Sequence, residues 1–289
     1  MVGEVEGPDQ GLASFAGLLG TMPSMDAHVV TLSHGPVRYL EAGAGRPMVL
    51  LHAFPLGADQ WAPQLSAPPA GWRLIAPDLR GFGGSHGAPL ADVTIDTYAA
   101  DAFALMTALG VSSATVVGLS MGGYVALAMI AREPSRIDGL VLADTRAEAD
   151  SATARAGRDR MRDLLRREGP AGVATDMLPK LLGETTRRTD ASVEATVRRL
   201  IESQRADGIE AAIRAMKTRA DHTTRLPAIA CPTTVVCGAE DVLTPPYQCE
   251  AMSRQIPGAR FVRIDGAGHL ANLEAPQEFS GTTGTTGER

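Results

Sequence analysis

The sequence predicts an α/β fold in which a mostly parallel central sheet is flanked by helices and interrupted by a helical cap. Short apolar segments typical of strands alternate with segments of helical periodicity, and this alternation is typical of parallel sheets. One long block, residues 146–225, contains no convincing strand and interrupts the alternation. The chain has 289 residues, of which 44% are hydrophobic, so it can bury a substantial core.

The first half of the chain contains most of the predicted strands. Residues 29–32 and 37–40 flank a His-Gly-Pro turn and predict an antiparallel pair. Residues 48–51, Met-Val-Leu-Leu, form an unbroken apolar run, which indicates a strand buried on both faces. Further strands are expected at 72–76, 114–117 and 139–143, and helices at 94–109 and 121–132.

The cap and the ends of the chain complete the predicted organisation. The block 146–225 is rich in Arg, Glu and Ala with helical spacing, and strands resume at 233–237 and 260–264. The N-terminal residues are acidic where a secretory signal would be basic, and the final Ser/Gly/Thr-rich residues cannot form an amphipathic helix. We therefore expect a poorly ordered extension (1–25), a core (26–145 and 226–280), an inserted cap (146–225) and a flexible tail (281–289).

Composition limits the classes of partner. The net charge is −6, which gives no electrostatic reason to bind nucleic acid or anionic lipid. No run approaches the roughly 18 apolar residues that span a bilayer. Three cysteines, Cys231, Cys237 and Cys249, lack the spacing of a disulfide framework or a zinc site. We expect a cytoplasmic protein that acts on a small molecule, and the sequence does not determine its oligomeric state.

A Gly-x-Ser-x-Gly pattern at residues 118–122 provides the central chemical signal. The pattern is weak alone, but here it joins the strand ending at Val117 to the helix beginning near Met121. Such a turn lifts the central serine, Ser120, above the sheet as a nucleophile. The glycines are expected because side chains there would collide with neighbouring elements. The helix N-terminus favours developing negative charge.

A serine hydroxyl needs a base, and the base needs an acid that fixes its tautomer. Of the six histidines, His269 lies in a glycine-rich loop after the last strand, at the same sheet edge as Ser120. Asp241 follows the strand 233–237, and its neighbour Glu240 should point away from it. The order Ser120, Asp241, His269 is that of nucleophile, acid and base. The histidines expected on the surface or in turns are His28, His34, His86 and His222.

An oxyanion intermediate needs two backbone N–H donors. The residue after the nucleophile, Met121, supplies one. The second is expected from Phe54, in the segment His52-Ala53-Phe54-Pro55 that follows the strand 48–51. We expect His52 to orient that loop rather than to take part in catalysis.

These segments together resemble the α/β-hydrolase superfamily, in the branch of small carboxylesterases, 3-oxoadipate enol-lactonases and cofactor-free haloperoxidases or perhydrolases. The resemblance covers residues 27 to 279 and implies the α/β-hydrolase fold with the triad Ser120, Asp241 and His269. It departs from the family at Ala53, where glycine is usual, and in the last helix, which we expect to be shortened. The resemblance is carried by residues 51–55, 77–85, 118–123, 238–246 and 266–269.

The resemblance leaves a second candidate for the acid of the triad. Some members of the superfamily place the acid after the preceding strand, where Asp144 stands. Asp241 is favoured because its Gly-x-x-Asp-x-x-x-Pro setting is typical of the family and because it lies one strand before His269. For Asp144, which opens Asp144-Thr145-Arg146, we expect a helix-capping or arginine-pairing role.

The expected reaction is transfer of the acyl group of a small carboxylic ester to water, without metal or organic cofactor. Phe54, Trp61 and Met121 predict a fairly hydrophobic substrate, and the low aromatic content of 4% predicts short acyl groups. An enol-lactonase would use the same triad, but its substrate carries carboxylates and would need a cap arginine facing the pocket. A perhydrolase would use hydrogen peroxide in place of water. A non-enzymatic ligand receptor with the same fold is a further alternative, which ester turnover would exclude.

Overall fold

The computed structural model describes residues 26–284, which form an eight-stranded sheet in the order β1-β2-β4-β3-β5-β6-β7-β8. The strand β2 pairs antiparallel with both β1 and β4, and all other neighbours are parallel. This arrangement confirms the predicted fold class. The strands are β1 (Asp26–Leu32), β2 (Gly35–Gly43), β3 (Arg46–Leu51), β4 (Trp72–Pro77), β5 (Ala114–Leu119), β6 (Ile137–Ala143), β7 (Thr233–Gly238) and β8 (Arg260–Ile264).

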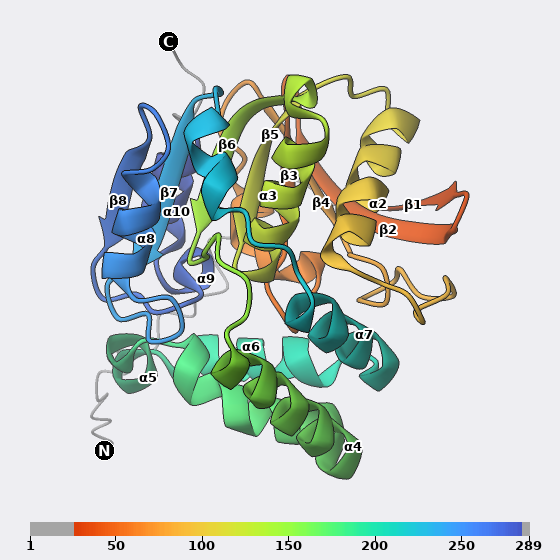
Figure 1. Ribbon diagram of the computed structural model, residues 1–289, viewed down its shortest axis with the longest axis vertical. Coiled ribbons are helices and arrows are strands. Elements are labelled where there is room, and N and C mark those ends of the chain that lie inside the picture. The colour runs from red at the N-terminus through yellow and green to blue at the C-terminus, as the bar shows by residue number, and fades with distance from the viewer. Residues whose placement is uncertain (1–25, 285–289) are drawn as a thin grey trace, which may run out of the picture.

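Helices cover both faces of this sheet. In Figure 1, α2, α3 and α8 lie in front of the strands, whereas α10 lies behind them. The capping box of Thr94 and Thr97 begins α2 close to the predicted position. The helices of the core are α1 (Ala62–Ser66), α2 (Ile95–Ala108), α3 (Met121–Arg132), α8 (Pro246–Ser253), α9 (Ala271–Glu274) and α10 (Pro276–Thr283), with 3-10 turns η2 (Ala58–Trp61) and η3 (Pro134–Arg136).

The central strands form the core because their side chains are apolar on both faces. Every residue of β5 and of β7 is buried, and β3 and β6 are exposed only near their first residues. A parallel sheet covered on both sides requires such continuous apolar runs. The buried strands therefore leave the binding of a ligand to the loops at their carboxyl ends, which is where ligands bind in open α/β sheets.

The cap is inserted between β6 and β7 and lies across one end of the sheet (Figure 1). Its longest helix leaves helical geometry at Gly169, with φ of 65° and ψ of −167°, and Pro170 follows. The resulting kink lets residues from both halves of the helix reach one pocket. The cap consists of α4 (Ala152–Leu181), α5 (Glu184–Thr189), α6 (Ala191–Glu202) and α7 (Ala206–Lys217), followed by the 3-10 turn η4 (Thr223–Ala228).

The last helix differs from the prediction. Helix α10 runs to Thr283, so residues 281–283, which we expected in a flexible tail, are helical. The helix is held by a buried face: Phe279 packs against Trp61 with ring centroids 5.9 Å apart, and the Thr283 side chain is also buried. Tertiary burial overrides the poor intrinsic helix propensity of this segment. The expectations for residues 1–25 and 285–289 fall outside the described chain. None of the described helices is both long enough and apolar enough to cross a membrane.

Candidate active site

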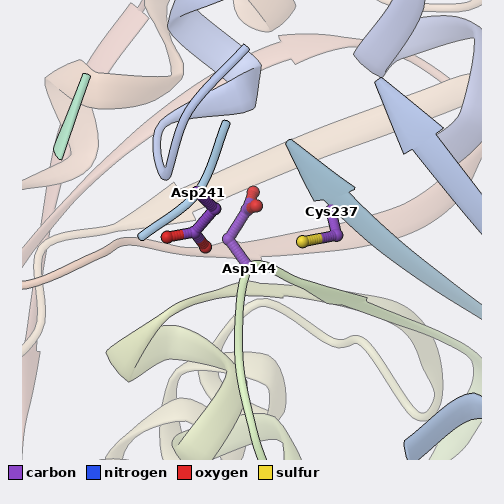
Figure 2. Close-up of side chains that lie close together, drawn as sticks. All are labelled: Asp144, Cys237 and Asp241. Atoms are coloured by element: carbon purple, nitrogen blue, oxygen red, sulfur yellow. The ribbon is translucent and has the colours of Figure 1, made fainter. Parts of the chain in front are cut away.

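Four polar residues gather where neighbouring parallel strands end. Ser120 follows β5, Asp144 follows β6, Asp241 lies in the loop after β7, and His269 lies in the loop after β8. Asp144 and Asp241 lie close together there, beside Cys237 at the end of β7 (Figure 2). Since the four strands are adjacent and parallel, their carboxyl ends share one edge of the sheet.

Ser120 occupies a sharp turn between β5 and α3. Its backbone has φ of 54° and ψ of −112°, a conformation that residues other than glycine rarely adopt. A Cβ atom on Gly118 would collide with the Gly122 carbonyl, and one on Gly122 would collide with the Leu51 carbonyl. The glycines of the motif are therefore required by close backbone approach, as the sequence predicts. The turn is fixed by the Ser120 N–H, which donates to the Ala143 carbonyl at 2.9 Å.

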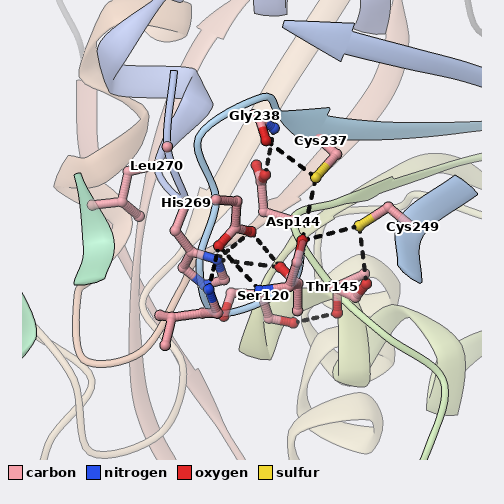
Figure 3. Close-up of polar contacts among 12 residues, drawn as sticks. Ser120, Asp144, Thr145, Cys237, Gly238, Cys249, His269 and Leu270 are labelled. Carbon is pink, nitrogen blue, oxygen red and sulfur yellow. Dashed lines mark hydrogen bonds and ion pairs between the residues drawn. The ribbon is translucent and has the colours of Figure 1, made fainter. Parts of the chain in front are cut away.

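The three residues predicted to act together form one chain of hydrogen bonds. The Ser120 Oγ lies 2.7 Å from His269 Nε2 (Figure 3), and His269 Nδ1 lies 2.8 Å from Asp241 Oδ2. Because an ionised carboxylate can only accept, Nδ1 carries the proton and Nε2 is free to accept from the serine hydroxyl. The His269 side chain is only 3% exposed, and that of Asp241 is fully buried, so water competes little for these bonds.

Asp241 is held as an anion by its loop. Its Oδ1 accepts from the N–H groups of Leu243 at 2.7 Å and Thr244 at 3.0 Å, and its Oδ2 also accepts from the Thr244 hydroxyl. Burial opposes ionisation, but the charge of His269 and these hydrogen bonds outweigh it and lower the pKa of Asp241 to about 2. Glu240 points away from His269, as expected, and accepts at 2.8 Å from the N–H of Thr185 in α5 of the cap.

Asp144 does not have the role that the sequence suggested. Its side chain is fully buried, its Oδ1 accepts from the Gly238 N–H at 2.8 Å, and its Oδ2 has no hydrogen-bond partner among residues 26–284. It neither caps a helix nor pairs with an arginine of the described chain. With φ of 46° at the end of β6, the Asp144 side chain turns inward toward β7 instead. The prediction of a capping or arginine-pairing role was wrong.

The surroundings of Asp144 favour its neutral form. Burial, followed by the charge of Asp241, raises the pKa of Asp144 well above its usual range. A hydrogen bond with Cys249 and burial also raise the pKa of the neighbouring Cys237 thiol. The potential ligand atoms of Asp144, Cys237 and Asp241 lie within 4.8 Å of one another. A protonated thiol and a protonated carboxyl are poor metal ligands, so this cluster is a weak candidate for a metal site.

The loop after β3 fixes the peptide that precedes Phe54. The Ala53 carbonyl accepts from the Leu56 N–H at 2.9 Å and from His52 Nδ1 at 2.9 Å. On its other side, His52 Nε2 accepts at 3.1 Å from the Leu79 N–H. Burial lowers the pKa of His52, so the neutral tautomer that makes both bonds is favoured. This geometry agrees with the expectation that His52 orients the loop.

Two backbone N–H groups are left free by this arrangement. In a trans peptide the N–H points opposite to the carbonyl, so the anchored Ala53 carbonyl sets the direction of the Phe54 N–H. Neither Phe54 nor Met121 donates its N–H to an acceptor within residues 26–284. Ala53 does not have a positive φ, so alanine is tolerated where glycine was expected.

Both the sequence and the fold resemble those of known proteins. The model of the alpha/beta hydrolase fold family matches residues 46–276. The chain belongs to the alpha/beta hydrolase fold family. It is 32% identical to a protein of Mycobacterium tuberculosis named "Putative non-heme bromoperoxidase BpoC", over 83% of this chain and 92% of that protein.

Solved structures of alpha/beta hydrolases resemble the chain closely. A thermophilic esterase from Thermogutta terrifontis, solved with malate bound, is 38% identical with a TM-score of 0.84, covering 89% of this chain and 96% of the esterase. The enol-lactonase from Burkholderia xenovorans LB400 is 27% identical with a TM-score of 0.81, covering 88% of this chain and 97% of the lactonase. The chain is therefore similar over nearly its whole described length to hydrolases of more than one specificity.

A pocket of about 270 Å³ adjoins the polar residues of this alpha/beta hydrolase. Ser120, His269 and Phe54 line it from the core. The cap and neighbouring loops contribute residues that the sequence did not single out, because helical spacing locates a helix but not the cavity that it faces. From the cap and loops these are the apolar residues Met161, Met177, Met216 and Leu243, and the charged residues Arg146, Asp150, Arg158 and Lys180; Tyr124 lines the pocket from α3 of the core.

Two residues expected to contact substrate lie elsewhere. Trp61 is fully buried against Phe279 and does not line the pocket. The Met121 side chain is also fully buried in the core, although its backbone N–H remains available. Large apolar side chains near a motif more often pack in the core than form the wall of a pocket.

The other histidines and cysteines follow the predictions with one exception. His222 is buried, not exposed, because the chain returning from the cap packs on its beginning and the His222 N–H bonds to the Ala147 carbonyl at 2.9 Å. His86 is exposed, as expected. The free cysteines on or near strand β7 are Cys231, which is half-buried, and Cys237, which is buried.

Proposed function

We propose that this alpha/beta hydrolase is a serine hydrolase that cleaves small carboxylic esters through an acyl-enzyme on Ser120. The observation that carries the proposal is the unbroken hydrogen-bond chain from Ser120 Oγ through His269 to Asp241. In this geometry the imidazole can accept the serine proton as the oxygen attacks a carbonyl. The similarity to an esterase over most of both chains supports the ester as substrate.

The acylation step assigns a role to each group. His269 Nε2 takes the proton of Ser120, whose oxygen adds to the ester carbonyl, and Asp241 stabilises the resulting imidazolium. The N–H groups of Phe54 and Met121 bind the oxyanion, and their lack of other acceptors in the described chain supports this role. His269 then protonates the departing alcohol, which leaves the acyl group on Ser120.

Deacylation repeats these steps with water as the nucleophile. His269 removes a proton from water, the hydroxide adds to the acyl carbonyl, and the proton returns to Ser120 as the acid departs. An enol-lactonase would open a cyclic ester by the same steps, and the similarity to the Burkholderia xenovorans enzyme supports it as the second candidate. A perhydrolase would admit hydrogen peroxide in place of water.

Labelling of the nucleophile tests the proposal. The protein should hydrolyse p-nitrophenyl acetate and gain the mass of one fluorophosphonate at Ser120. Ser120→Ala should lose at least ~10³ in kcat, because nucleophile and base act as a unit. Ser135→Ala, which alters an exposed serine far from the pocket, is the matched control and should keep both properties.

Three outcomes would refute the proposed function. They are a wild-type protein without adduct, an adduct at another residue, or full activity in Ser120→Ala. A protein that takes up the label but turns over no ester would favour the ligand receptor instead.

A further inference from the structure

The wall of the pocket that Ser120 lines also carries an arginine, Arg146. Arg146 follows Thr145, whose hydroxyl donates to the Ser120 carbonyl at 2.8 Å. The Arg146 Nη2 donates to the Leu243 carbonyl, in the same loop as Asp241. These contacts hold Arg146 between the loop after β6 and the loop after β7, where it lines the same pocket as Ser120.

The guanidinium of Arg146 has no acidic partner in the described chain. No carboxylate of residues 26–284 forms an ion pair with it, and its Nε is buried without a hydrogen-bond acceptor. A guanidinium has several N–H donors, of which the Leu243 carbonyl takes one. Placing a charge in a protein without a counter-charge is unfavourable, so an anion entering from solvent would be stabilised here.

The remaining charges of the pocket do not supply that anion. Lys180 pairs with Asp176 at 2.7 Å. The carboxylate of Asp150 is shared by two arginines: its Oδ2 lies 3.0 Å from Arg158 Nε, and its Oδ1 accepts from Arg219. Burial opposes the ionisation of Asp150, but the two arginines outweigh it and lower its pKa, so this carboxylate is ionised and fully engaged. The wall therefore has more positive than negative charge.

We propose that the natural substrate is an ester or lactone that carries a carboxylate, and that Arg146 binds this carboxylate. The inference rests on the proposed ester hydrolysis and adds the class of substrate. A guanidinium fork matches the two oxygens of a carboxylate in one plane, and such charge-assisted pairs are stronger than neutral ones. Because the pocket is only about 270 Å³, one small substrate molecule would carry both the carboxylate that Arg146 binds and the ester carbonyl that Ser120 attacks.

A matched pair of substrates tests this proposal. Monomethyl glutarate carries a free carboxylate, and methyl 5-amino-5-oxopentanoate replaces it with a neutral amide of the same shape. For the wild type, kcat/KM should be about tenfold or more higher for the carboxylate. The preference should shrink as salt is added, since salt screens charge pairs that solvent reaches. Equal kcat/KM for both substrates at low salt would overturn the proposal.

Substitutions locate the site of recognition. Arg146→Gln should remove most of the preference by lowering kcat/KM for the carboxylate ester, while the amide ester changes by no more than about twofold. Arg146→Lys should restore part of it, because it keeps the charge but not the fork. Arg166→Gln removes the same charge from an exposed part of α4 and should leave the preference unchanged. Equal losses for both substrates in Arg146→Gln would overturn the assignment.

Direct binding separates failure of this inference from failure of the proposed function. Glutarate should bind the wild type and Ser120→Ala equally in calorimetry, and should bind Arg146→Gln at least ~10-fold more weakly. If no ester is hydrolysed but glutarate binds through Arg146, the proposed function fails and the carboxylate site stands. If neutral esters are hydrolysed and glutarate does not bind, the carboxylate site fails alone.

Discussion

Replacing Asp241 by asparagine tests the contact that orients the imidazole of His269. In the wild type the Asp241 Oδ2 accepts from His269 Nδ1, while Oδ1 accepts from Leu243 and Thr244 N–H groups. Asparagine can keep its carbonyl on those two N–H groups, so its NH₂ then faces His269 Nδ1. That nitrogen must become an acceptor, which moves the ring proton to Nε2, where it opposes removal of the Ser120 proton.

The charge of Asp241 and the tautomer of His269 both contribute to the size of the effect. The pKa of Asp241 falls from 3.8 to about 2, which corresponds to roughly 2.5 kcal/mol in favour of the ionised form. That free energy corresponds to a factor of only about 10², and the reversed tautomer is expected to supply the rest of a total loss in kcat of about 10³ to 10⁴. KM should change little, since Asp241 does not line the pocket.

Asp144→Asn is the matched control, because it makes the same chemical change one strand away. Asp144 does not contact His269, and its surroundings favour a neutral side chain that asparagine resembles. Its kcat should fall by no more than about tenfold. The assay is p-nitrophenyl acetate hydrolysis at pH 7, with thermal melts to establish that both variants are folded.

The opposite result would move the acid to Asp144. If both variants melt like the wild type and Asp144→Asn is the one that loses activity, the Asp241 contact is not the one used in catalysis. If neither variant loses activity, His269 does not depend on either carboxylate and the tautomer reasoning fails.

Two further predictions concern the length of the substrate's acyl group and the stability of the protein in acid. Short acyl esters should be preferred, because the pocket is about 270 Å³; a kcat/KM that rises steadily beyond about ten acyl carbons would contradict this. The depressed pKa of Asp241 contributes stability that is present above pH 3.8 and lost as pH falls toward about 2. The free energies of unfolding of the wild type and Asp241→Asn, measured with urea, should therefore approach each other by roughly 2.5 kcal/mol as the pH falls through that window. A difference between the two that stays constant with pH would contradict the shift.

Local patterns are sufficient to predict the sharp turn at Ser120 and the sheet. The turn around Ser120 depends on a few consecutive residues, because Gly118 and Gly122 are required by backbone atoms within or beside the turn itself. The central strands were recognised because burial on both faces demands continuous apolar runs, which one sequence displays. The strand order then placed Asp241 and His269 at the edge that Ser120 occupies.

The sequence did not predict the contents of the pocket. It located the cap, but not that Met161 and Met177 reach the same cavity from two halves of a kinked helix. Trp61 was expected in that cavity and is used for packing against α10, 218 residues away along the chain at Phe279. Which side of a helix or loop faces a cavity depends on packing between distant segments, and helical periodicity does not contain that information.

The sequence by itself therefore determined the family, the order of Ser120, Asp241 and His269 along the chain, and the segments that present them. Only the tertiary structure decided that Asp144 is buried without an arginine and that Arg146 lacks a carboxylate partner. The physical reason is that a charge or hydrogen-bonding group is defined chemically by what lies within a few ångströms of it. Those neighbours come from strands and loops far apart in sequence, so their effect on a side chain exists only after the chain has folded.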